Sequence, residues 1–191
     1  MKLAAPVGAK TRPTSDRVRE ALFNIVRHKL EGARFLDLFA GSGAVGLEAL
    51  SRGAPFAVFV DKRPECARVI RRNVEKARFV DKARILTMDA AKAVRFLAAE
   101  GQIFDLVYLD PPYLGGFGGE GLIPLVLSEI DRGGVAGPGA LVVAESALGD
   151  AAAVPGELGY LVTRSERYGD TALTFMEKTE TVNDSDLSGQ F

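Results

Sequence analysis

The chain has 191 residues, of which 47% are hydrophobic and 26% charged, and its formal net charge at pH 7 is −1. This length and composition are typical of one soluble globular domain with a substantial core, and a second catalytic domain would not fit. One cysteine, Cys66, and one histidine, His28, exclude an intramolecular disulfide and cysteine-based or histidine-rich metal sites. No apolar run approaches 18 residues, and the start of the chain is too short and broken for a signal peptide, so we expect a cytoplasmic protein that binds neither membrane nor metal.

The first predicted element is a helix that begins at capping residues in 12–16 and runs to about residue 29, with Val18, Leu22, Ile25 and Val26 at helical spacing. Strands and helices then alternate over 35–132, which predicts parallel strands with right-handed crossovers. The remaining predicted elements are a glycine-rich turn at 133–139, a buried strand at 141–144, and a final antiparallel pair at 160–164 and 172–176.

These elements predict an α/β fold whose seven-stranded, mostly parallel sheet has its last strand inserted antiparallel. We expect one domain over 1–178, in which 1–34 form an N-terminal arm and helix. The segment 179–191 is polar and mildly acidic, so we expect a disordered tail there.

The segment 35–46, Phe-Leu-Asp-Leu-Phe-Ala-Gly-Ser-Gly-Ala-Val-Gly, predicts a strand, a glycine turn and the start of a helix. Gly41, Gly43 and Gly46 have the spacing of a dinucleotide-binding loop. A pyrophosphate prefers cationic or neutral surroundings, whereas Asp37 precedes this turn and the segment contains no Lys or Arg. A carboxylate there suits the ammonium group of a methionine moiety and would repel a diphosphate, so S-adenosylmethionine is favoured over NAD.

Two further carboxylates follow predicted strands. Asp61 ends the second strand, 20 residues after Gly41, where a carboxylate can accept both hydroxyls of a ribose; this role is shared by NAD and adenosine sites. Asp89 ends the third strand, where its side chain and the backbone N–H of Ala90 could bind the edge of an adenine. The alternative for Asp89 is an N-cap on the helix that begins there.

The tetrapeptide Asp110, Pro111, Pro112 and Tyr113 closes the apolar run 104–109, at the place where an open α/β sheet carries its chemistry. The Asp110 carboxylate and the Pro111 carbonyl can accept two hydrogen bonds from one exocyclic NH₂, while the Tyr113 ring stacks on the base. Proline adds no donor and fixes its own φ, so these acceptors keep their direction. The pattern is typical of a methyl-transfer site on a planar amine; the alternative is an ordinary turn at the end of a strand.

The small net charge hides an asymmetry along the chain. Residues 1–99 contain 20 Lys and Arg against 10 Asp and Glu, whereas 100–191 contain 4 against 15. The basic residues are concentrated further in 1–34, with eight against three, and in 62–84, with nine against three. Charged runs on helices are usually solvated faces, but two such clusters beside the glycine turn also fit a surface that binds the phosphates of a nucleic acid.

Three segments together resemble the RsmD-type methyltransferases, which methylate the N2 amine of a guanine in bacterial small-subunit (16S) ribosomal RNA. They are 36–54, 110–113 and, most specifically, 12–24 with the sequence Arg-Pro-Thr-Ser-Asp-Arg-Val-Arg-Glu-Ala-Leu-Phe-Asn. The resemblance implies a Rossmann-like class I methyltransferase fold, a three-layer sandwich, with S-adenosylmethionine as the methyl donor. The expected partner is ribosomal RNA or the assembling small ribosomal subunit, bound by a monomer.

The resemblance also implies roles for individual residues. Cofactor binding is expected at Asp37, Phe39, Ala40, Gly41, Ser42, Gly43, Asp61, Lys62, Asp89 and Ala90. The target amine is expected at Asp110, Pro111, Pro112 and Tyr113. RNA binding is expected at Arg12, Thr14, Arg17, Arg19 and Tyr113. The alternative for the arginines is that they pair with nearby acids such as Asp16 or Glu20 and only brace the helix.

Two other functions remain open. An adenine-N6 methyltransferase would use the same glycine turn and a similar tetrapeptide, more often with Asn in place of Asp110, although 191 residues hold no added target-recognition domain. A non-catalytic module of ribosome assembly that binds S-adenosylmethionine would not need the intact tetrapeptide.

Overall fold

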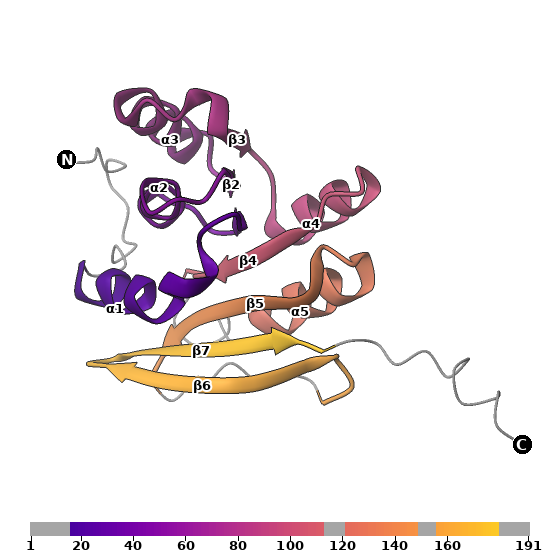
Figure 1. Cartoon of the computed structure of the whole chain (residues 1–191). Helices are drawn as coiled ribbons and strands as arrows, with labels where there is room; N and C mark the ends of the chain where they lie inside the picture. Colours follow the sequence, from indigo (N-terminus) through magenta and orange to yellow (C-terminus); the bar gives the residue numbers. More distant parts are fainter. Residues whose placement is uncertain (1–15, 113–120, 149–155, 180–191) are drawn as a thin grey trace, which may run out of the picture.

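The structure, a computed structural model, describes residues 16–112, 121–148 and 156–179, and these residues fold around one seven-stranded sheet. Its strands are β1 (Arg34–Asp37), β2 (Phe56–Val60), β3 (Ala83–Leu86), β4 (Phe104–Leu109), β5 (Ala136–Ala147), β6 (Tyr160–Tyr168) and β7 (Thr171–Lys178). Its helices are α1 (Asp16–Val26), α2 (Ala44–Ser51), α3 (Pro64–Ala77), α4 (Ala90–Ala99) and α5 (Leu122–Gly133), with short 3₁₀ turns η1 (Arg27–Lys29) and η2 (Val80–Lys82). Helices α1, α2 and α3 cover one face of the sheet and α4 and α5 the other, which confirms the predicted three layers (Figure 1).

The strand order is β3-β2-β1-β4-β5-β7-β6. Strands β1 to β5 are parallel, and β7 lies antiparallel between β5 and β6, so the predicted single antiparallel strand is confirmed. From β1 the chain moves outward through β2 and β3, then returns to place β4 on the other side of β1. The β1/β4 boundary is therefore the switch point, where ligands of open α/β sheets bind.

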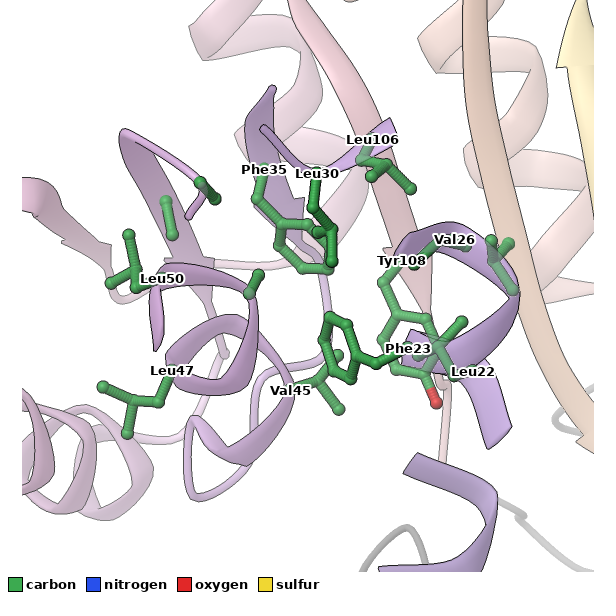
Figure 2. Packing of buried hydrophobic residues seen from close by; sticks show 14 of the residues in the cluster. Leu22, Phe23, Val26, Leu30, Phe35, Val45, Leu47, Leu50, Leu106 and Tyr108 are labelled. Carbon is green, nitrogen blue, oxygen red and sulfur yellow. The ribbon is translucent and has the colours of Figure 1, made fainter. Parts of the chain in front are cut away.

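Helix α1 is fixed to the sheet beside this switch point by buried aromatic side chains. Leu22 and Phe23 of α1 belong to the same core as Phe35 of β1 and Tyr108 of β4 (Figure 2). The ring centroids of Phe23 and Phe35 lie 6.4 Å apart, within the range of favourable aromatic pairs. Burying one such side chain contributes roughly 1.5–3 kcal/mol, so this contact holds the buried side of α1 against the sheet.

The predicted turn at 133–139 is correct only in its first part. Helix α5 ends at Gly133 and is capped by Gly134, whose φ is 62°, but β5 already begins at Ala136 and runs through the glycine-proline segment. Phe104 of β4 pairs with Ala136 and Leu106 with Leu141, so two residues along β4 correspond to five along β5. The residues that indicated a turn form a bulge, in which one strand holds extra unpaired residues and keeps its direction.

The findings on membrane helices, metal sites and the tail apply to the described residues alone. Within the described ranges no helix is both long and apolar enough to cross a membrane. Among these same residues no three His, Cys, Asp or Glu side chains come together in a group that could hold a metal ion. The predicted tail, apart from its first residue, lies outside the described residues.

Candidate active site

Four carboxylates lie at the edge where the parallel strands end. Asp37 is the last residue of β1, Asp61 and Asp110 directly follow β2 and β4, and Asp89 lies between β3 and α4. Because β3, β2, β1 and β4 are adjacent and parallel, their carboxyl ends meet at one edge of the sheet. This edge contains the switch point, so the structure brings the four predicted acids together at the usual ligand crevice.

The turn between β1 and α2 has a backbone geometry that favours glycine. Gly41 and Gly43 have φ of 54° and 79°, in the left-handed region. The Gly43 N–H donates to the Ala40 carbonyl over 2.6 Å, and the Ala40 N–H donates to the last carbonyl of β2 over 2.8 Å. The side-chain amide of Asn73, buried in α3, donates to the Ser42 carbonyl over 2.9 Å. Three hydrogen bonds therefore fix the turn: one within it, one to β2 and one from α3.

Gly46 is required for a different reason. A Cβ at this position of α2 would lie 2.3 Å from Cε1 of Phe59 on β2, so only glycine lets the helix lie this close to the sheet. By contrast, a Cβ on Gly41 would meet nothing nearer than 4.0 Å. The third glycine of the motif thus serves packing, while the first leaves open space at the strand ends.

Asp37 is 1% exposed and faces the backbone of the glycine turn. Its Oδ2 accepts the Gly46 N–H over 3.2 Å. Burial raises the pKa of Asp37 to about 7; the Gly46 and Phe39 N–H groups oppose this rise, and the charge of Asp61 adds to it. The carboxylate therefore braces the start of α2, and its expected contact with an ammonium group stays a prediction.

Asp61 is 7% exposed and accepts four N–H groups. Its Oδ2 accepts from Gly41 N over 3.0 Å and from Arg63 Nη2 over 3.1 Å. Its Oδ1 accepts from Arg63 N over 2.9 Å and from Arg63 Nε over 3.1 Å. A carboxylate has about four acceptor positions, so the neighbours of Asp61 occupy the oxygens expected to hold a ribose. Arg63 was not singled out from the sequence, where its only signal is a guanidinium two residues after a strand-ending acid.

Asp89 is exposed, and its Oδ1 accepts the Ala91 N–H over 3.0 Å. It is thus the N-cap of α4, the alternative that the sequence left open; its contact with an adenine stays a prediction. Ala90 is the buried first residue of α4, and Phe39 is half-buried. Lys62 is exposed and forms no ion pair with any described residue.

The start of the tetrapeptide lies beside the glycine turn. Asp110 and Pro112 are half-buried and Pro111 is buried, directly after β4. The backbone N–H of Leu38 donates to the last but one carbonyl of β4 over 3.0 Å, so the two chain segments still run side by side here. Tyr113 lies outside the described residues, and its stacking on a base stays a prediction.

Glu145 on β5 is a buried acid of this edge that was not singled out from the sequence. It is 4% exposed and accepts a hydrogen bond from the Tyr108 hydroxyl of β4. Leu109 pairs with Ala144, so Asp110 and Glu145 each come one residue later on neighbouring strands. Its sequence signal is the one shared by the other acids, a carboxylate that closes a buried apolar run.

Two of the expected RNA-binding residues lie in the described part of α1. Arg19 Nη2 lies 2.9 Å from Asp16 Oδ1, so for this arginine the bracing alternative is present. Arg17 is exposed and forms no ion pair with the described residues. Arg12 and Thr14 lie outside the described residues, and RNA binding by all four stays a prediction.

The chain matches a family model and bacterial relatives over most of its length. The family model described as Conserved hypothetical protein 95 matches residues 1–177. The YlbH protein of Bacillus subtilis, whose name proposes an rRNA methyltransferase, is 35% identical over 177 residues, 92% of each chain. The ribosomal RNA small subunit methyltransferase D of Escherichia coli K12 is 35% identical over 145 residues, 76% of this chain and 69% of the relative.

Solved structures show the same fold. The yhhF protein of Escherichia coli, whose name proposes a methyltransferase, superposes with a TM-score of 0.77 at 31% identity, covering 94% of this chain and 92% of that one. An RNA methyltransferase of Salinibacter ruber in complex with S-adenosyl-L-homocysteine has a TM-score of 0.68 at 15% identity, covering 91% and 97% of the two chains. The chain therefore has the Rossmann-like methyltransferase fold.

Proposed function

Because the chain belongs to the RsmD family of methyltransferases, we propose that it transfers a methyl group from S-adenosylmethionine to the N2 amine of a guanine in small-subunit ribosomal RNA. The relative from Escherichia coli is named for methylation of the small-subunit RNA, and the chain covers more than two thirds of that relative. The substrate is this RNA, free or within an assembling small subunit. A monomer that acts in the cytoplasm is part of the same proposal.

The observation that carries the proposal is the position of Asp110 beside the glycine turn. Methyl transfer requires the donor and the acceptor nitrogen to be held roughly 3–3.5 Å apart and in line. Neighbouring strands lie about 4.8 Å apart. A donor at the end of β1 and a base at the end of β4 are therefore close enough to react, because β1 and β4 are neighbours in the sheet.

The residues at the strand ends fit S-adenosylmethionine by their chemistry. When bound, this cofactor supplies a methyl group on a sulfonium that is already activated, so the protein mainly positions the reactants and excludes water. Acids at the strand ends are acceptors of the kind that ammonium, ribose and adenine groups require, and a Cβ on Gly41 would meet nothing nearer than 4.0 Å. The residues that would hold the cofactor are Asp37, Phe39, Ala40, Gly41, Ser42, Gly43, Asp61, Lys62, Asp89 and Ala90.

At the other side of the crevice, Asp110 and the carbonyl of Pro111 accept the two N–H groups of the target amine. These hydrogen bonds draw the nitrogen lone pair out of conjugation with the ring and aim it at the methyl group. Asp110 then accepts the proton that the methylated nitrogen releases. Pro112 fixes its own φ and restricts the backbone of Pro111 before it, and Tyr113 stacks on a base turned out of its helix.

Methylation of defined RNA oligonucleotides that carry one guanine or one adenine tests this assignment. We expect labelled methyl groups on guanine, with Asp110→Ala losing transfer while its affinity for S-adenosyl-L-homocysteine stays within a few-fold. Methylated adenine would establish the adenine-N6 alternative instead. Cofactor binding without transfer to oligonucleotides, ribosomal RNA or small subunits would establish the non-catalytic alternative.

A further inference from the structure

Helix α3 has one buried and one strongly basic side. Pro64 stands in its first turn, and Arg78 ends it with a φ of 61°. Its buried residues, which recur at helical spacing and face α2 and the sheet, are Cys66, Ala67, Ile70, Asn73 and Val74. The opposite side carries exposed arginines. We call six of the exposed cations of this helix and its flanks the α3 basic face: Lys62, Arg68, Arg71, Arg72, Arg78 and Lys82.

The cations of the α3 basic face form no ion pairs with the described residues. Elsewhere in the described chain most arginines and lysines have an acidic partner within 4 Å, as in the pairs Arg52–Glu48, Arg84–Glu100, Arg95–Glu129, Arg164–Glu166 and Lys178–Asp131. Glu65, Glu75 and Asp81, the acids of the same stretch, lie beyond ion-pair distance of these six cations.

Three arginines of the α3 basic face repel one another on the helix surface. Arg68 lies three residues before Arg71 and four before Arg72, which places like charges on neighbouring positions of the helix surface. Such pairs destabilise a helix by roughly 0.2–0.5 kcal/mol each. A polyanion laid along this side would turn the repulsion into attraction and release its own counterions.

The α3 basic face is connected to the candidate active site. Helix α3 begins three residues after Asp61, and the Asn73 amide on its buried side holds the Ser42 carbonyl of the glycine turn. It covers the same face of the sheet as α1, which carries Arg17 (Figure 1). On the opposite face, Arg95 of α4 and Arg132 of α5 both pair with Glu129.

We propose that the α3 basic face binds phosphates of the RNA substrate and so holds the RNA against the protein while the target base enters at Asp110. This inference rests on the proposed function and adds a binding surface to it. Four of the six cations are arginines, whose planar guanidinium matches phosphate oxygens with two parallel hydrogen bonds. Their open, unpaired geometry suits a flexible backbone of phosphates better than a folded protein partner with fixed carboxylates.

The test compares two triple variants with the same loss of charge. Arg68→Gln, Arg71→Gln and Arg72→Gln together remove three cations of the α3 basic face; glutamine keeps a helix propensity close to that of arginine. The control, Lys92→Gln, Arg95→Gln and Arg132→Gln, removes three cations from α4 and α5. Binding of small-subunit ribosomal RNA and methyl transfer to it are measured from low to high salt, together with the affinity for S-adenosyl-L-homocysteine and the melting temperature.

We expect the α3 variant to bind RNA about tenfold more weakly or worse at low salt, and the slope of log K against log salt to fall by about 2, since each phosphate contact contributes about 0.7–0.9. Cofactor affinity should match the wild type, and the melting temperature should not fall. The control should keep the wild-type slope.

Equal slopes in the α3 variant and the control would overturn the inference. So would an α3 variant that binds naked RNA normally and fails only on protein-containing subunits, because the partner would then be an acidic protein surface. If the wild type binds RNA without methylating it, the proposed function fails, and the binding measurements still decide the role of the α3 basic face.

Discussion

The guanidinium of Arg63 and the carboxylate of Asp61 lie in a two-pronged contact, with Nε and Nη2 each 3.1 Å from a different carboxylate oxygen. Backbone N–H groups of Gly41 and of Arg63 itself take the remaining acceptor positions. A ribose that binds Asp61 must therefore displace the Arg63 side chain, which is about one third exposed.

Alanine substitutions of Arg63 and Asp61, made separately, should change cofactor affinity in opposite directions. Arg63→Ala removes the competing guanidinium and should bind S-adenosyl-L-homocysteine several-fold more tightly. Asp61→Ala should weaken binding by about 1–3 kcal/mol, the cost of leaving buried polar groups unpaired. Titration calorimetry measures both, with Arg68→Ala as a control that leaves the cofactor site intact. Weaker binding by Arg63→Ala would mean that the guanidinium supports the carboxylate and does not compete with the ribose.

Asp37 should make stability depend on pH. Its folded pKa of about 7 lies above the ordinary 3.8, so the folded chain holds this proton more tightly than the unfolded chain. Below about pH 4 both states are protonated and Asp37 costs nothing; between pH 4 and 7 its cost grows as pH rises, and above 7 it is complete, at most about 4 kcal/mol. Asp37→Asn should therefore gain stability relative to wild type from pH 4 to 7 in denaturant unfolding. A stability difference between the variant and the wild type that stays constant from pH 4 to 7 would contradict the raised pKa of Asp37.

Gly46→Ala should destabilise the fold by about 1–3 kcal/mol, because the new Cβ overlaps the Phe59 ring. Phe59→Leu alone should also destabilise by removing buried ring atoms. The double variant should recover part of the loss, which a double-mutant cycle measures as a coupling energy. Additive losses would show that α2 moves away from the sheet without meeting Phe59.

Asn73→Ala should loosen the glycine turn from behind. The substitution removes the donor to the Ser42 carbonyl and leaves a buried space, with an expected loss of about 1–3 kcal/mol in unfolding free energy. Cofactor affinity should fall with it, because the turn is less well ordered. Glu75→Ala, on the exposed side of the same helix, is the matched control and should change neither quantity. Equal cofactor affinity in both variants would show that cofactor binding at the glycine turn does not depend on the hydrogen bond from Asn73.

The sequence predicted the sheet and the placement of the four acids because each acid lies at or shortly after the end of a strand-like segment. It predicted no contact between Arg63 and Asp61, since a side chain two residues away can turn toward its neighbour or toward solvent. Glu145 was missed although it ends its apolar run in the same way, because its partner Tyr108 lies 37 residues earlier in the chain. Pairing across strands depends on register, which local patterns do not give.

The bulge in β5 has a similar cause. Gly137, Pro138 and Gly139 favour a turn in isolation, whereas the neighbouring strand β4 offers hydrogen bonds on both sides of them. Tertiary pairing therefore overrides the local preference. The contact between Asp37 and the start of α2 was not predicted for the same reason: only the folded structure shows that its carboxylate reaches the Gly46 N–H nine residues later.

Mapping the methylated base tests the central claim most directly. Under-methylated small-subunit ribosomal RNA and intact subunits are incubated with labelled S-adenosylmethionine and either wild-type protein or Asp110→Ala, and the nucleosides are separated and identified by mass spectrometry. We expect N2-methylguanosine at a defined position with the wild type and none with Asp110→Ala. Label in adenosine, no label in the RNA, or equal transfer by Asp110→Ala would contradict it.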